Sequence, residues 1–259
     1  MTVRYEVASA IATITLDRPA ARNALGPDEW SALHEAVLRA GGDRAVRVVK
    51  LTGAPGAFSA GGDLRTMPER LALPPAERRA RLCADAQAIR ALRELARPVV
   101  ARIDGACVGA GLSLALACDL RLCSSRSTFA ASFVRVGLAS DFGALHLLPR
   151  AVGMTRATEL LLLGDTVEAA EAAAIGLVHA AHPVERFDAA VDALCERLAS
   201  APTAALALIK AGLNRAPDLD LSAAIEWEAA AQALASRTDD AREGVAAALE
   251  KRPPRFTGY

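Results

Sequence analysis

The segments AFSAGGDL, residues 57–64, and DGACVGAG, residues 104–111, carry most of the information about the fold. Each follows a short apolar run that reads as a buried strand and precedes a stretch that predicts a helix. One such glycine corner is usually no more than a tight turn. Two such corners in succession favour a ligand-binding site, because small residues let a ligand approach the backbone and N–H groups at a helix start are free to donate. Two N–H groups that converge on one oxygen form an oxyanion hole, which is the site that this pattern predicts.

Composition excludes several classes of protein. The chain has 259 residues, with 30 Lys and Arg against 30 Asp and Glu, so its formal net charge is zero. Proteins that bind nucleic acids or anionic membranes usually carry a basic excess, and we expect neither partner. The five cysteines form no C-x-x-C pair and predict neither a disulfide framework nor a metal site. The sequence shows no signal-peptide pattern and no apolar run long enough to span a membrane, so we expect a cytoplasmic protein.

Strand and helix patterns alternate to about residue 190, and helical patterns follow alone. Alternation favours an α/β fold with buried parallel strands. We therefore expect a core domain at residues 1–195 and a C-terminal helical region at residues 196–259, which packs on the core or on another subunit. Among the helices, the patterns predict one that begins near Asp63, one continuous helix over residues 76–96, and one that begins at Asp141.

The order of short motifs along the chain resembles that of the crotonase, or enoyl-CoA hydratase/isomerase, superfamily. The motifs are LDRP at 16–19, NAL at 23–25, FSAGGDL at 58–64, GACVGAG at 105–111, CD at 118–119, VGL at 136–138, LPR at 148–150, AIGLV at 174–178 and EKRPPRF at 250–256. This similarity covers nearly the whole chain. It implies a ClpP-like spiral of ββα units and a C-terminal helical region that supports homotrimers, often paired into hexamers. It also implies acyl-CoA thioester substrates, with no cofactor other than the coenzyme A of the substrate.

The same resemblance assigns roles to individual residues. It implies that the N–H groups of Ala60 and Ala110 form the oxyanion hole. The residues that it places along the coenzyme A site are Ala21, Arg22, Ala24, Gly61, Gly62, Asp63 and Leu64. Ser113 and Phe133 stand where a hydratase of this family has the two glutamates that hold and activate water. Neither side chain can act as a carboxylate acid or base, so we do not expect efficient hydration of a 2-enoyl-CoA.

One carboxylate remains near these positions, that of Asp141. Isomerases of the family that are related to phenylacetate catabolism look similar here and use an aspartate at this position. Shifting a double bond needs only one acid–base group, and burial against Phe133 and Phe142 would raise the pKa of the carboxyl. We therefore expect an enoyl-CoA isomerase with Asp141 as the proton shuttle. Asp141 could also act as the N-cap of the following helix, and the two roles are compatible.

Three other functions stay open at this point. The first is a hydratase or another enolate-based reaction such as decarboxylation, and the second is a protein that binds CoA thioesters with little turnover. The third is a serine hydrolase, because GLSLA at residues 111–115 is close to G-x-S-x-G and Asp165 and His179 follow in a permitted order. Against it, Ser113 lies inside a predicted helix and not at a strand-to-helix corner. His179 and His182 lack a nearby carboxylate motif and predict no metal site.

Overall fold

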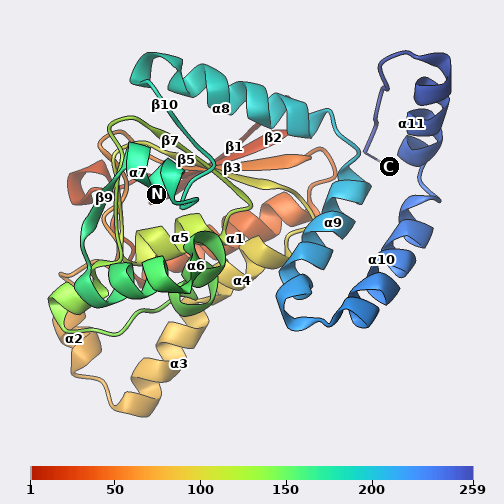
Figure 1. Ribbon diagram of the computed structural model, residues 1–259. Helices are drawn as coiled ribbons and strands as arrows, with labels where there is room; N and C mark the ends of the chain where they lie inside the picture. The colour runs from red at the N-terminus through yellow and green to blue at the C-terminus, as the bar shows by residue number, and fades with distance from the viewer. Residues whose placement is uncertain (1, 259) are drawn as a thin grey trace.

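Two β-sheets form the centre of the computed structural model, which describes residues 2–258 (Figure 1). The larger sheet has the strand order β1-β2-β3-β5-β7-β10 and is parallel except for the β1–β2 hairpin. The smaller sheet has the order β4-β6-β8-β9 and is parallel except for β8–β9. The strands are β1 (Val3–Ala8), β2 (Ile11–Leu16), β3 (Val48–Gly53), β4 (Ala57–Ser59), β5 (Val99–Ile103), β6 (Ala106–Val108), β7 (Leu120–Ser124), β8 (Thr128–Ala130), β9 (Thr166–Glu168) and β10 (Ala180–His182).

Successive strands alternate between the two sheets. Along the chain, β4 follows β3, β6 follows β5 and β8 follows β7, so that each of these three strands of the larger sheet leads into a strand of the smaller one. The chain therefore advances as a spiral of ββα units, and the fold class predicted from the sequence is confirmed. Strands β4 and β6 lie within the glycine-rich segments and are not predicted from the sequence, because strands of three residues are too short to show an alternating pattern.

Helices cover both sheets and form the C-terminal part of the chain. They are α1 (Pro27–Gly42), α2 (Met67–Leu71), α3 (Pro75–Asp85), α4 (Gln87–Glu94), α5 (Ala110–Ala117), α6 (Ala144–Leu163), α7 (Ala169–Ala174), α8 (Val184–Ala199), α9 (Thr203–Arg215), α10 (Leu221–Ala235) and α11 (Asp239–Glu250), with single 3-10 turns η1 (Pro19–Ala21), η2 (Ser132–Val136) and η3 (Ala216–Asp218).

Three helix predictions need correction. The helix expected near Asp63 begins at Met67, because Asp63 first holds a turn: its carboxylate accepts from the Arg65 N–H, and its backbone carbonyl oxygen accepts from the Thr66 hydroxyl. The helix expected over residues 76–96 is divided at Ala86: α4 buries Ile89 and Leu92 in the core, whereas α3 has no buried residue. The helix expected to begin at Asp141 begins three residues later, after Gly143 with its positive φ of 83°.

The larger sheet is covered on both faces. Helices α1, α4 and α5 lie on one side of it, and α8 crosses the other side (Figure 1). Phe187, Val191 and Cys195 of α8 pack with Val48 and Val100 of the sheet. The domain boundary predicted at residue 195 therefore falls inside a helix that belongs to the core, and the helical extension begins after the end of α8.

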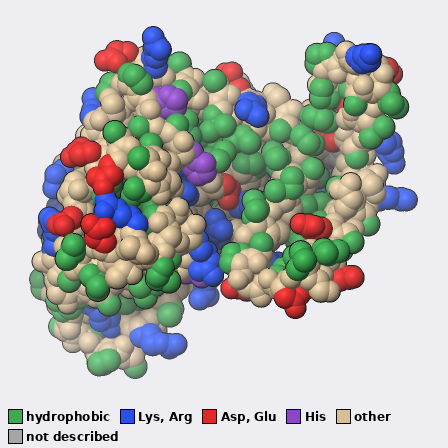
Figure 2. All heavy atoms as spheres, viewed as in Figure 1, with side chains coloured by type: hydrophobic (Ala, Val, Ile, Leu, Met, Phe, Trp, Pro, Cys, Tyr) green, Lys and Arg blue, Asp and Glu red, His purple; other side chains and the backbone are tan. Residues whose placement is uncertain are grey.

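Helices α9, α10 and α11 project from the core as an arm (Figure 1). The Nζ atom of Lys210 on α9 lies 2.8 Å from the Asp119 carboxylate, and Arg47 donates to the carbonyl oxygens of Ala201 and Phe256. Hydrophobic side chains gather on the concave side between arm and core (Figure 2). Leu213, which lines the groove between α9 and α10, exposes 68% of its surface. Within residues 2–258, no helix is long and apolar enough to cross a lipid bilayer.

Candidate active site

The structure brings the two glycine corners into contact. Gly61 has a φ of 91°, and a Cβ atom built on it would lie 2.7 Å from the Val108 carbonyl oxygen and 3.4 Å from the Ala110 nitrogen. A Cβ atom on Gly111 would lie 2.7 Å from the Cβ atom of Ser59. Real Cβ atoms do not approach other atoms so closely, so both corners need glycine to pack against each other. The two corners are therefore adjacent, as an oxyanion site shared between them requires.

Backbone hydrogen bonds decide which N–H groups of these corners are free. The Ala60 N–H donates to the Arg22 carbonyl oxygen at 2.9 Å, so it cannot also donate to a ligand, and the expectation for Ala60 needs correction. The bridge between Leu25 and Gly62 uses the carbonyl oxygen of Gly61 and the N–H of Asp63. Within the described residues, the N–H groups of Gly62 and Ala110 have no hydrogen-bond acceptor. Since Ala110 is the first residue of α5, its N–H also lies at the positive end of the helix.

A short loop after β2 supports the first corner. Asn23 has a positive φ of 56°, which asparagine tolerates better than most residues. Its side-chain amide donates to the carbonyl oxygens of Ala54 at 2.9 Å and Ala57 at 2.7 Å, and the Ser59 hydroxyl donates to its carbonyl oxygen. In the sequence, Asn23 stands out only as part of the family motif NAL. This positioning role could have been inferred from the sequence, because Asn23 lies in a turn motif next to residues assigned to the site.

The neighbours of Asn23 are those expected to line the coenzyme A site. Ala21 ends the turn η1, and the Ala24 N–H donates to its carbonyl oxygen. Arg22 adopts a left-handed conformation with a φ of 49° and is exposed. Within residues 2–258 its guanidinium has no carboxylate within 4 Å. Its positive charge is therefore available to an anionic group in solution.

The Asp63 carboxylate is paired with arginines of the protein itself, so it is not free to contact a ligand. It is buried, and it pairs with Arg18 at 3.0 Å and with Arg65 at 2.9 Å. The hydrogen bond from Arg65 is the main reason that the pKa of Asp63 lies well below its usual range, and Arg18 adds to the effect. The carboxylate thus holds the turn after Gly62 together, while Leu64 beside it exposes 59% of its surface.

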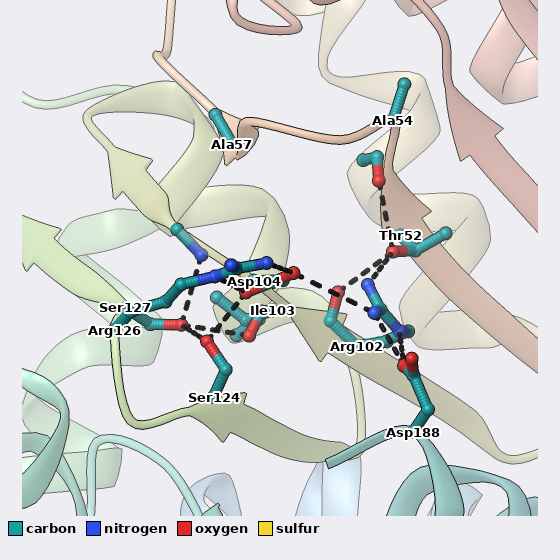
Figure 3. A network of polar contacts seen from close by, with 12 residues as sticks. Thr52, Ala54, Ala57, Arg102, Ile103, Asp104, Ser124, Arg126, Ser127 and Asp188 are labelled. Atoms are coloured by element: carbon teal, nitrogen blue, oxygen red, sulfur yellow. Dashed lines mark hydrogen bonds and ion pairs between the residues drawn. The ribbon is translucent and has the colours of Figure 1, made fainter. Parts of the chain in front are cut away.

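A polar network at the end of β5 fixes the second corner (Figure 3). Asp104 accepts hydrogen bonds from Ser124 at 2.7 Å and from the guanidinium of Arg126, which lowers its pKa. Ser127 accepts from the Gly105 N–H at 3.2 Å and donates to the Ile103 carbonyl oxygen. These bonds tie the start of the corner to the turn after β7, and so set the direction of β6 and α5.

Asp141 has a carboxyl group whose pKa is raised, in contrast to that of Asp63. Burial raises its pKa to about 6, although Arg70 and Arg78 act in the opposite direction. Its Oδ1 atom is buried and has no hydrogen-bond partner within residues 2–258. The N-cap residue of α6 is Gly143, without a side-chain cap bond, so the alternative role of Asp141 as the N-cap is wrong. A half-buried carboxyl group with one buried, unpaired oxygen is suited to exchange protons with a ligand.

Contacts on both sides of Asp141 hold it in place. The Ser113 hydroxyl on α5 donates to the Asp141 carbonyl oxygen at 3.0 Å. Phe142, which follows, has a positive φ of 51°, a conformation that costs roughly 1–2 kcal/mol for a residue with a Cβ atom. Its ring stacks on Trp30 with the centroids 4.3 Å apart, and this packing stabilises the strained backbone. Ser113 thus lies beside the site, as a residue that positions Asp141.

Phe133 lies beside the second corner. It exposes 8% of its surface, and a Cβ atom on Gly109 would lie 3.9 Å from its ring. The ring therefore forms an apolar wall next to the turn that carries Ala110. Ser113 and Phe133 occupy the two hydratase positions, and the hydrogen bond from Ser113 places Asp141 next to α5.

The serine hydrolase alternative is incompatible with this geometry. The Ser113 hydroxyl is used by the Asp141 carbonyl oxygen, and Asp165 pairs with Arg135. His179 lies at the edge of β7, where its Nδ1 atom accepts from the Arg121 N–H at 3.1 Å, and burial is the main cause of its lowered pKa. The three residues do not bond to one another. No group of three His, Cys, Asp or Glu side chains within residues 2–258 is placed to hold a metal ion.

A ββα spiral with two free N–H groups at neighbouring glycine corners defines the crotonase class of proteins. The chain belongs to the enoyl-CoA hydratase/isomerase family, whose model matches residues 6–259. It is 38% identical over 258 residues to a protein of Rhodobacter capsulatus named "Probable enoyl-CoA hydratase", covering 99% of this chain and 98% of the relative. It is 34% identical over 266 residues to the 1,2-epoxyphenylacetyl-CoA isomerase of Escherichia coli, covering 97% of each. The crystal structure of an enoyl-CoA hydratase/isomerase from Cupriavidus metallidurans has a TM-score of 0.94 at 37% identity and covers 100% of this chain and 97% of that one.

Proposed function

We propose that this acyl-CoA enzyme is an enoyl-CoA isomerase that moves a double bond from the 3-position to the 2-position of the thioester. The observation that carries the proposal is the state of Asp141, a half-buried carboxyl group with a buried, unpaired Oδ1 atom and a pKa of about 6. A double-bond shift uses one group first as base and then as acid. A pKa close to neutrality suits both roles, because the group gains and loses its proton at little free-energy cost.

The reaction proceeds through two proton transfers on Asp141. Its carboxylate removes a proton from C2 of the 3-enoyl-CoA, and the electron pair of that C–H bond forms a dienolate. The negative charge rests on the thioester oxygen, to which the N–H groups of Gly62 and Ala110 donate. The protonated carboxyl then returns the proton to C4, which leaves the double bond between C2 and C3 in conjugation with the thioester. A lost donor of this kind raises the barrier by about 3 kcal/mol.

The loop after β2 and the first corner bind the coenzyme A portion of the substrate. Ala21, Ala24 and Gly61 provide backbone without bulky side chains, so that the nucleotide and pantetheine can lie close to the main chain. Arg22 offers to the phosphates an exposed positive charge that is unpaired among residues 2–258. Leu64 is exposed beside the corner and offers an apolar contact. Asp63 stabilises this segment through Arg18 and Arg65 and makes no direct contact with the ligand.

The test follows the conversion of a 3-enoyl-CoA to the conjugated 2-enoyl-CoA by absorbance. We expect the wild-type protein to catalyse it and Asp141→Asn to lose at least about a thousandfold in kcat, within the range for a general acid–base group. Asp165→Asn is the matched control, because this carboxylate is exposed and pairs only with Arg135 among the described residues. Undiminished conversion by Asp141→Asn would refute the proposal.

Hydration is the second candidate, because the relative in Rhodobacter capsulatus is named a hydratase. Adding water across a double bond needs one group to take a proton from water and another to protonate carbon. Ser113 and Phe133 replace both glutamates, and Asp141 alone would have to serve both roles. Faster water addition to a 2-enoyl-CoA than isomerisation of a 3-enoyl-CoA would establish this alternative. Tight binding of CoA thioesters without any turnover would instead identify a binding protein.

The exposed groove between α9 and α10 supports a homotrimeric assembly. The side chains of Ile209, Leu213 and Ile225 in this groove are more than half exposed in the single chain. Large contiguous apolar surfaces of this kind are typical of subunit interfaces. We expect sedimentation to give a trimer or a hexamer, and Leu213→Glu to shift the population towards the monomer.

A further inference from the structure

Arg78 on α3 carries a positive charge that no carboxylate neutralises in the part of the chain that the structure describes. Its Nη1 atom is buried and has no hydrogen-bond acceptor within residues 2–258. The contact of its Nη2 atom is the sulfur of Met67, at 4.0 Å. Arg70, which also acts on Asp141, is neutralised by the Asp85 carboxylate at 2.6 Å. No carboxylate of the described chain lies within 4 Å of Arg78. A buried, unsatisfied charged donor is costly, and such groups are usually completed by a ligand.

Arg78 lies on the side of the proposed site that would hold the acyl chain, near Gly62 and Asp141. Met67, which its guanidinium touches, has its methyl group 3.9 Å from the place where a Cβ atom on Gly62 would lie. The charge of Arg78 also acts on Asp141, the group proposed to exchange protons with the acyl chain. Arg22, by contrast, lies in the loop after β2 and is available to the phosphates of coenzyme A.

From this geometry we infer that Arg78 determines substrate specificity by binding a carboxylate at the distal end of the acyl chain, so that the substrates are CoA thioesters of dicarboxylic acids. This inference rests on the proposed function for the placement of the acyl group. A carboxylate matches the need because a guanidinium presents parallel N–H donors to its two oxygens, and because its charge neutralises the cation in a partly buried place. A plain hydrocarbon chain would leave the buried Nη1 donor without a partner.

Binding of saturated thioesters tests the inference apart from catalysis, since they contain no double bond to move. The ligands are adipyl-CoA and hexanoyl-CoA, which have the same chain length and differ in the terminal carboxylate. By titration calorimetry, we expect adipyl-CoA to bind the wild-type protein at least about tenfold more tightly, as a charge-assisted hydrogen bond provides. Equal affinities, or a preference for hexanoyl-CoA, would overturn the inference.

Variants identify the residue responsible for such a preference. Arg78→Gln should bring the two dissociation constants within about twofold of each other. Arg79→Gln, one position along on the exposed side of α3, is the matched control and should keep the wild-type ratio. Arg78→Lys keeps the charge without the forked donors and should show an intermediate ratio, which covers the case of a poorly folded Gln variant. A full preference retained in Arg78→Gln would also overturn the inference.

The outcomes for the two proposals are separable. If the adipyl-CoA preference depends on Arg78 but no 3-enoyl-CoA is isomerised, the specificity stands and the isomerase proposal fails. If a 3-enoyl-CoA is isomerised but the two saturated thioesters bind equally, the isomerase proposal stands and the role of Arg78 fails.

Discussion

Asp141→Asn should make the protein more stable at neutral pH while it removes the proposed activity. Burial of the ionised carboxylate is the main cause of its raised pKa, so the folded state pays for keeping that charge. Asparagine has the same shape and no charge. The substitution therefore removes the penalty without opening a cavity, and the contacts of Phe142 with Trp30 and of Ser113 with the backbone of residue 141 should persist.

The magnitude follows from the pKa shift. The pKa moves from 3.8 to about 6 on folding. Each pK unit corresponds to about 1.4 kcal/mol, so the penalty at pH 7 is at most about 3 kcal/mol. Because the folded-state pKa of Asp141 is the higher one, the folded state binds the proton more tightly. The penalty is therefore absent below the unfolded value of 3.8, grows as the pH rises towards 6, and is complete above it.

Urea denaturation of wild type and Asp141→Asn at two pH values measures this difference. At pH 7.5, a value chosen above the shifted pKa, we expect the variant to be more stable by about 2 kcal/mol, allowing for the partial exposure of the side chain. At pH 4 the difference should nearly vanish, because the wild-type carboxyl is then protonated in the folded state. Equal stabilities at both pH values would mean that the carboxylate is solvated, and would refute the account of its pKa.

Four further results are expected. The kcat/KM of isomerisation should fall about tenfold from pH 7 to pH 5, because Asp141 with a pKa of about 6 loses its basic form there; a flat profile would contradict this. Ser113→Ala should lower kcat and leave KM for the thioester within about twofold, since the hydroxyl holds Asp141 and not the ligand; an unchanged kcat would argue against that positioning role. Gly111→Ala should destabilise the fold by about 1–3 kcal/mol in urea denaturation, because its methyl group would collide with Ser59; Gly42→Ala, with open space around it, is the control. Lys210→Met should cost about 3 kcal/mol of stability, because it leaves the Asp119 carboxylate without this partner, and a wild-type melting curve would show that the pair contributes nothing.

Much of the architecture was predictable because it depends on local pattern. The hairpin of β1 and β2, the strand before each glycine corner and the apolar helix α5 follow from residues close together in the sequence. Strands β4 and β6 escaped prediction since three residues carry too little pattern. The break between α3 and α4 also escaped it, because it depends on which apolar residues the core receives, and Ile89 and Leu92 are the ones that it buries.

The candidate site shows the same division at the level of single atoms. From the order of its motifs, the sequence determined the family, the pair of corners and the isolated aspartate, because residue type and spacing suffice for these. Tertiary structure alone decided which donors are free: the Ala60 N–H is used by Arg22 and that of Gly62 is not. It also decided that the Oδ1 atom of Asp141 is buried and unpaired, and that Arg78, whose charge acts on Asp141, has no carboxylate partner within residues 2–258. Hydrogen-bond partners, burial and electrostatic neighbours come from segments distant in the chain, and only folding brings those segments together.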